Sequence, residues 1–115
     1  EEIAVSRYNL AEACSAKGFD DFALALHEAN VRDQVPPPAS YRKAMSLRRK
    51  MKDPQGEIAA IDAMIEWFDW MLRQSQAFYE ISGEEMPHMQ LTSHIAERAK
   101  LEARRERVAK KAAGA

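Results

Sequence analysis

Residues 61–80, IDAMIEWFDWMLRQSQAFYE, form the stretch that decides the fold. At about 100° per residue, a helical period gathers the polar side chains of this stretch into an arc of roughly 80°. The arc consists of Asp62, Glu66, Asp69, Arg73, Gln76 and Glu80. The apolar side chains spread over about 200°, roughly twice the stripe of an ordinary surface helix, so one neighbouring helix cannot cover them. We therefore predict an all-α helical bundle of about five helices, with one long central amphipathic helix over about 54–82 and a charged C-terminal helix.

Three uses of this apolar surface compete: the core of this chain, docking of another chain, or attachment to a membrane. Surface-binding amphipathic helices usually carry Lys and Arg on their polar face, whereas this arc is mainly acidic, so we expect no membrane contact. Helical stripes of Met and aromatic residues are most often core. Trp70 lies near the edge of the polar arc, however, and exposed aromatic side chains beside charge are typical of interfaces. The candidates for an apolar interface are Trp67, Trp70, Met71 and Phe78.

Glycine and proline positions predict a helical hairpin over residues 1–35. A first helix over 2–17 should end at Gly18, because glycine readily takes the left-handed conformation that terminates helices. A second helix over 19–30 should fold back on the first. The three prolines at 36–38 cannot continue a helix and predict a stiff connector over 36–40.

The second part of the chain contains the basic helix, the long core helix and the tail helix. Ser40 is a predicted N-cap for a helix that runs through Lys52. Asp53 followed by Pro54 predicts the cap and first residue of the long helix, which should end near Gly83. The basic and long helices together occupy 41–86, and a basic, alanine-rich tail helix over about 90–112 lies within 87–115.

Length and composition are those of one ordinary domain. A chain of 115 residues can bury a core without disulfides or a structural metal, so we predict a single helical domain over 1–115. Cys14 is the only cysteine, which excludes an internal disulfide and favours a reducing compartment. No apolar run is long enough to span a bilayer and no secretory signal opens the sequence. We therefore expect a cytoplasmic protein.

The formal net charge of −1 conceals blocks of opposite sign. Residues 1–40 carry −4, residues 41–52 carry +6 with no acid, residues 53–87 carry −7, and residues 88–115 carry +4. Blocks of opposite charge can specify which surfaces meet. They would allow the basic helix of one copy to meet the acidic arc of another.

The motifs that would carry catalysis or metal binding are incomplete. A zinc-protease helix needs a second histidine four residues after the first, but Val31 stands four residues after His27. Glu85 and His88 have the spacing found in di-iron bundles, yet those sites require further carboxylates and a second such motif. The four glycines are too scattered for a phosphate-binding loop. We therefore predict no enzyme, no catalytic or metal site and no cofactor.

The basic helix within 41–52 and the basic tail helix within 87–115 are the features of the sequence that best indicate a function. A cationic surface of this kind can dock an acidic protein surface or neutralise phosphates. We predict a non-enzymatic protein–protein interaction module whose partner is a protein, with a homo-oligomer favoured. The alternative is an accessory nucleic-acid-binding protein that contacts phosphates through the basic helix and the tail. The predicted contact residues are Arg42, Lys43, Arg48, Arg49, Lys50, Lys52, Arg104, Arg105 and Arg107.

Overall fold

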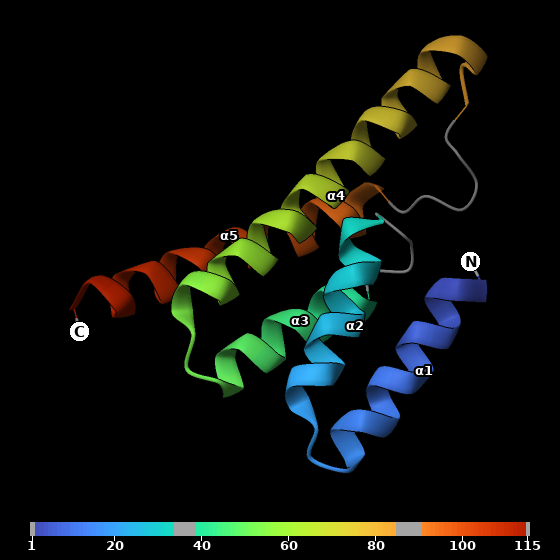
Figure 1. The fold of residues 1–115 in the computed structure, drawn as a ribbon. Helices are drawn as coiled ribbons and strands as arrows, with labels where there is room; N and C mark the ends of the chain where they lie inside the picture. The colour runs from blue at the N-terminus through green and yellow to red at the C-terminus, as the bar shows by residue number, and fades with distance from the viewer. Residues whose placement is uncertain (1, 34–38, 85–90, 115) are drawn as a thin grey trace.

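The computed structural model describes residues 2–33, 39–84 and 91–114 (Figure 1). These ranges form five α-helices and contain no strand, which confirms the predicted all-α fold with a long central helix. The prolines at 36–38, predicted to form a connector, lie outside the described residues. The helices are α1 (Glu2–Ala16), α2 (Asp20–Arg32), α3 (Ala39–Lys50), α4 (Pro54–Ser82) and α5 (Leu91–Gly114).

The boundaries of α4 follow the local signals in the sequence. The Asp53 side chain accepts a hydrogen bond from the backbone N–H of Gly56 at 2.9 Å, and Pro54 is the first helical residue. This arrangement satisfies one of the backbone donors that a helix start leaves unpaired. At the other end, Gly83 adopts a left-handed conformation with φ of 73°, and its N–H donates to the carbonyl of Tyr79. Both predicted ends of this helix are therefore confirmed.

The prediction that Ser40 caps α3 is wrong. The helix begins at Ala39, and Ser40 is only 4% exposed. Its hydroxyl accepts a hydrogen bond from Nδ2 of Asn30 at 3.0 Å and lies 3.2 Å from Nδ1 of His27. Packing against the polar side of α2 thus takes the hydroxyl away from the helix end. The predicted end of this helix is also two residues too late, since α3 stops at Lys50.

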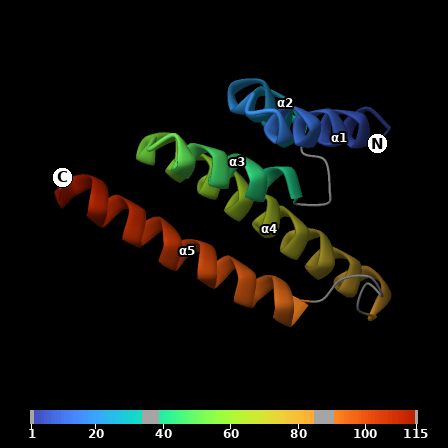
Figure 2. The same cartoon turned by 90° about the horizontal axis from the view of Figure 1, so that it is seen from below.

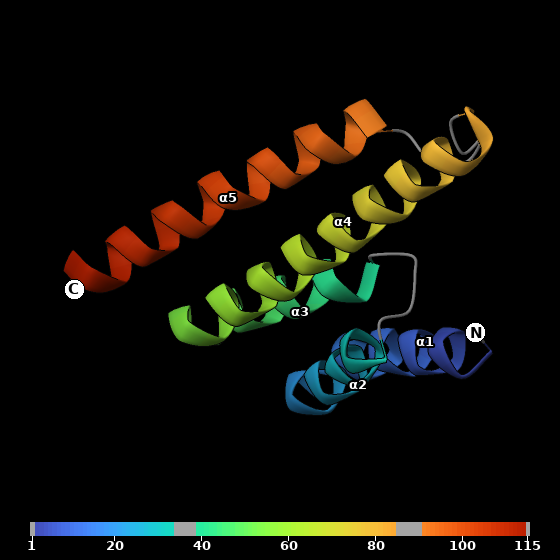
Figure 3. The ribbon, with the colours of Figure 1, turned by 90° about the horizontal axis from the view of Figure 1, so that it is seen from above.

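The helices form an open array in which each packs mainly against its neighbours in sequence. Figure 2 shows the α1–α2 hairpin, α3, α4 and α5 as successive layers. From above, α5 runs antiparallel to α4, with α3 on the other side of α4 (Figure 3). The Cα atoms span 48 × 39 × 18 Å, so the molecule is flat. Flat, sequential packing leaves large parts of the outermost helices uncovered.

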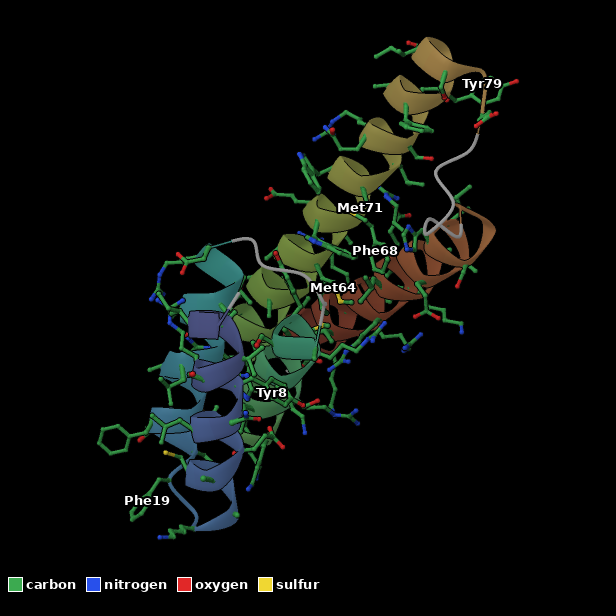
Figure 4. The ribbon with its side chains drawn as sticks, turned by 90° about the vertical axis from the view of Figure 1, so that its right-hand side faces the viewer. Tyr8, Phe19, Met64, Phe68, Met71 and Tyr79 are labelled. Carbon is green, nitrogen blue, oxygen red and sulfur yellow. The ribbon has the colours of Figure 1, made fainter. Side chains whose placement is uncertain are left out.

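Two apolar clusters hold the array together, and α3 contributes to both. Tyr41 and Met45 face α4 and α5, whereas Ala44 and Leu47 face the hairpin. Met64 and Phe68 of α4 lie on the side of that helix that meets α5 (Figure 4). The larger cluster contains Tyr41, Met45, Ile61, Met64, Trp67, Phe68 and Leu101, and the smaller contains Ala11, Ala23, Leu24, Ala44 and Leu47.

The long helix α4 has a covered half and an uncovered end. Residues 61–68 supply the large buried side chains of the helix, between α3 and α5. In contrast, every residue in 76–84 is exposed, including Ile81 at 88%. Tyr79 projects from this end, far from the hairpin (Figure 4). Two neighbouring helices therefore cover one half of the broad apolar surface, and the described helices leave its last two turns open.

Candidate interaction surfaces

Most cations of the basic helix α3 have carboxylate partners within the chain. Lys43 Nζ lies 3.2 Å from Glu12 of α1, and Lys50 Nζ lies 2.7 Å from Asp20 of α2. Arg42 has a longer contact of 3.8 Å with Glu97 of α5. The surface of α3 is thus much less positive than its sequence suggests, because the acidic hairpin neutralises it.

Arg48 is the most strongly engaged residue of α3. Its guanidinium donates to both carboxylate oxygens of Glu28, at 3.0 and 2.9 Å, and to Oδ2 of Asp53 at 2.9 Å. Hydrogen bonding to Glu28 is the main reason why the pKa of Arg48 is raised, and Asp53 adds to the effect. Of the two adjacent predicted contact residues, Arg48 ties α2 to the start of α4, whereas Arg49 is exposed.

The cations of α5 are paired with the acidic arc of α4. Arg98 donates to Asp69 at 2.6 Å and Arg105 donates to Asp62 at 2.6 Å. These hydrogen bonds raise the pKa values of both arginines. Charge blocks of opposite sign therefore pair within one chain. As a result, α5 partly covers the arc of polar side chains on α4.

Arg104 forms the most buried ion pair of the molecule's described part. Its Nε and Nη2 donate to Oε2 of Glu57 at 3.0 and 2.8 Å. The Glu57 side chain is only 7% exposed. A carboxylate buried to this extent requires a charged partner, so Glu57 fixes Arg104 against the first turn of α4.

The structure brings the two predicted basic segments together at one place. A hollow with a volume of about 660 Å³ lies between the end of α3, the start of α4 and the last turns of α5. We call it the basic groove and define it by the five cations that line it. They are Arg49, Lys52, Arg104, Arg107 and Lys111. Lys111 was absent from the predicted contact set, although it stands four residues after Arg107, one helical turn further along the same face.

The apolar interface candidates on α4 divide between core and surface. Trp67 lies in the larger core cluster and is 7% exposed. Met71 is half-buried against that cluster. Trp70 and Phe78 remain accessible, at 46% and 37% exposed. The aromatic surface available to a partner on α4 is thus smaller than its sequence indicates.

The hairpin carries an apolar face that the sequence reasoning missed. The hairpin packs on α3 through its small apolar cluster, and it exposes Ile3, Leu10 and Phe22 at 66%, 55% and 68%. Ile3, Leu10 and Leu26 line a shallow hollow between α1 and α2. We call these four residues the hairpin face. Their spacings of seven on α1 and four on α2 were a usable signal.

A polar cluster between the hairpin and α3 places Ser40, His27 and Glu12 next to one another. Ser40 Oγ lies 3.2 Å from Nδ1 of His27, and Nε2 of His27 lies 3.5 Å from Glu12. A nucleophilic serine must reach substrate, but His27 is 0% and Ser40 4% exposed. Burial lowers the pKa of His27, against the opposing effect of Glu12. The cluster therefore serves the packing of α2 on α3.

Two other kinds of site are absent from the described residues. No group of three His, Cys, Asp or Glu side chains in this part of the chain is arranged to hold a metal ion. None of the described helices is sufficiently long and apolar to cross a membrane. Comparison with family models, with curated proteins and with solved structures gives no match for this chain. The case for function therefore depends on the surfaces themselves.

Proposed function

We propose that this chain is a non-enzymatic helical interaction module that self-associates through the hairpin face. The observation that carries the proposal is the exposure of the large apolar side chains Ile3, Leu10 and Phe22 on the hairpin. Contiguous exposed apolar residues on a small protein are typical of binding surfaces. Because Cys14 cannot form an internal disulfide, we further propose that the module works in the cytoplasm.

The hairpin face suits a second copy of the same chain. Its hollow is lined in part by Ile3, Leu10 and Leu26. The exposed Phe22 stands four residues before Leu26 and so lies on the same face of α2. In a twofold dimer each copy presents the same patch to the other. Phe22 of each copy can then enter the hollow of its partner, and an aromatic side chain in such a pocket is a typical anchor of binding energy.

Charge also favours pairing of hairpins over pairing of α3 with α4. Arg48 and Lys50 of α3 and Arg98 and Arg105 of α5 already form ion pairs with carboxylates of their own chain. An interface built on those charges would have to break existing ion pairs. The hollow of the hairpin face is apolar apart from Ser6 and Arg7, and Arg7 already pairs with Asp33 in its own chain.

The test is the oligomeric state of two matched variants. We expect the unmodified chain to form dimers in sedimentation velocity between about 1 and 100 µM, the range in which weak dimers populate. Phe22→Ser should shift the chain to monomer, whereas Ile81→Ser, at the exposed end of α4, should leave the dimer unchanged. A monomer at the highest concentration would refute self-association. Dissociation by Ile81→Ser alone would move the interface to α4.

The nucleic-acid alternative has a narrower basis. Of the nine predicted contact residues, Arg49, Lys52 and Arg107 are those without an ion-pair partner among the described residues. Duplex DNA is usually held by many phosphate contacts along an extended surface. These three residues, with Lys111, provide only a short contact in one groove, so we favour the interaction module.

A further inference from the structure

The basic groove concentrates positive charge from α3, from the turn that follows it and from α5. Arg49 and Lys52 come from the end of α3 and the turn that follows it, and Arg107 and Lys111 come from α5. None of these four has an ion-pair partner in the described part of the chain. Apolar atoms of Pro54, Val108 and Ala112 complete the lining. The groove therefore offers free cations beside a surface that can cover an uncharged group.

Each of the two carboxylates that line the groove already has an arginine partner, and Asp53 shares its arginine with Glu28. Asp53 accepts from Arg48 through Oδ2 and from the backbone N–H of Gly56 through Oδ1. Glu57 accepts two hydrogen bonds from Arg104. Paired carboxylates exert little net repulsion on an incoming anion, because the compensating cation lies at hydrogen-bonding distance. The charge of the four free cations therefore remains available.

Lys52 occupies a backbone position that ordinarily favours glycine. Its φ is 56°, the one positive value at a non-glycine residue in the described ranges. A side chain in this left-handed conformation costs about 1–2 kcal/mol. The conformation turns the chain from α3 into α4, and Lys52 then lines the groove. A lysine here places a cation in the groove where glycine would suit the turn better.

We propose that the basic groove binds a small ligand that carries two or more closely spaced phosphate groups. An oligophosphate concentrates several negative charges within a few ångströms, which matches a cluster of free cations better than the widely spaced carboxylates of an acidic peptide. Arg49 and Arg107 supply planar guanidinium groups that can bind phosphate oxygens in pairs, and Lys52 and Lys111 add compact charges. The apolar part of the lining can contact whatever group bears the phosphates.

A small ligand fits this surface better than a nucleic-acid polymer. Of the cations of α3 outside the groove, Lys43, Arg48 and Lys50 pair with the hairpin, and Arg42 contacts Glu97 of α5. On α5, Arg98 and Arg105 are neutralised by α4. A polymer that left the groove would therefore meet paired charges, and its further phosphates would gain little.

The proposal is tested by calorimetric titration with inorganic tripolyphosphate, ATP and a single-stranded oligonucleotide. Lys111 and Lys110 provide the matched pair: they are adjacent and exposed, and only Lys111 lines the groove. We expect Lys111→Glu to weaken tripolyphosphate binding on the order of tenfold at low salt, because a charge at close range is reversed. Lys110→Glu should change it less than about twofold. Equal losses would indicate a diffuse field and overturn the proposal.

Lys52→Gly separates ligand binding from folding. Glycine relieves the left-handed strain, so the variant should be at least as stable as the unmodified chain. It should nevertheless bind tripolyphosphate more weakly, because one cation is lost. Equal binding of tripolyphosphate and ATP would indicate that the phosphates alone are recognised, and tighter binding of ATP would indicate that the nucleoside contacts the apolar lining; both support the proposal. Absence of tripolyphosphate and ATP binding, or binding of the oligonucleotide alone, would refute it.

Discussion

Phe68 provides the sharpest test of the sequential packing of the helices. Its side chain is 2% exposed and meets the ring of His94 on α5 at a centroid distance of 5.3 Å, as well as the neighbouring Trp67. Replacing a buried phenylalanine with alanine costs roughly 3–5 kcal/mol through lost apolar contact and the cavity that remains. Phe68→Ala should therefore loosen α5 from α4.

Phe78 on the same helix is the matched control. It is 37% exposed, against 2% for Phe68. For a phenylalanine side chain of about 200 Å², this difference corresponds to roughly 70 Å² of apolar surface, or about 1.8 kcal/mol at 25 cal/mol per Å². The exposed position also adds no closed cavity. Phe78→Ala should thus cost at least about 2 kcal/mol less than Phe68→Ala in urea unfolding.

The helices that lose hydrogen-exchange protection in Phe68→Ala distinguish an open array from a single shared core. Because α5 packs mainly on α4, amide hydrogen exchange in Phe68→Ala should accelerate first in α5 and the middle of α4. Protection in the α1–α2 hairpin should change much less, since local opening follows the contacts that are lost. A uniform loss of protection over all five helices would refute the inference that the helices are stabilised by their sequence neighbours.

Two further predictions concern buried or paired charges. Arg48→Glu should destabilise the chain by on the order of 2–3 kcal/mol in urea unfolding, because it places a third carboxylate beside Glu28 and Asp53, whereas Arg49→Glu should be nearly neutral; equal effects would contradict the assigned roles. Because burial lowers the pKa of His27 in the folded state, the neutral form stabilises the fold fully above about pH 6.5, and this stability should decline as the pH falls below that value. His27→Gln should flatten that part of the pH profile of unfolding free energy, and an unchanged slope would show that other groups cause it.

Local chemistry made the ends of α4 predictable. Asp53, Pro54 and Gly83 act through their own backbone and a few neighbouring residues, so their effect can be read from sequence spacing. The hydroxyl of Ser40 is different, because His27 and Asn30 approach it from another helix. Whether the Ser40 hydroxyl caps α3 or joins a buried hydrogen-bond network depends on tertiary packing. The spacing of residues along one helix gives no information about that packing.

The surface sites were harder to predict for the same reason. Helical spacing places Trp67 and Trp70 only about 60° apart around α4. The positions of α3 and α5 therefore decide which of the two is covered. Likewise, the cations at Arg48 and Arg49 are adjacent in sequence, and only the approach of Glu28 makes one structural and leaves the other free. The hairpin face was overlooked because the aromatic residues of α4 dominate the sequence.

The alternating charge blocks specify the register of α5 on α4. Asp62 and Asp69 are seven residues apart, as are Arg98 and Arg105, and the two pairs join in antiparallel order. A slip of one heptad would pair Arg98 with Asp62 and leave Arg105 without a carboxylate. Exposed ion pairs add little to stability, but a slip that leaves charges unmatched is disfavoured against the native register. The charges of α3 select the hairpin in the same way. A chain with a net charge near zero can therefore carry strongly charged segments whose charges pair with one another. Among the described residues, the basic groove keeps a cluster of cations without ion-pair partners.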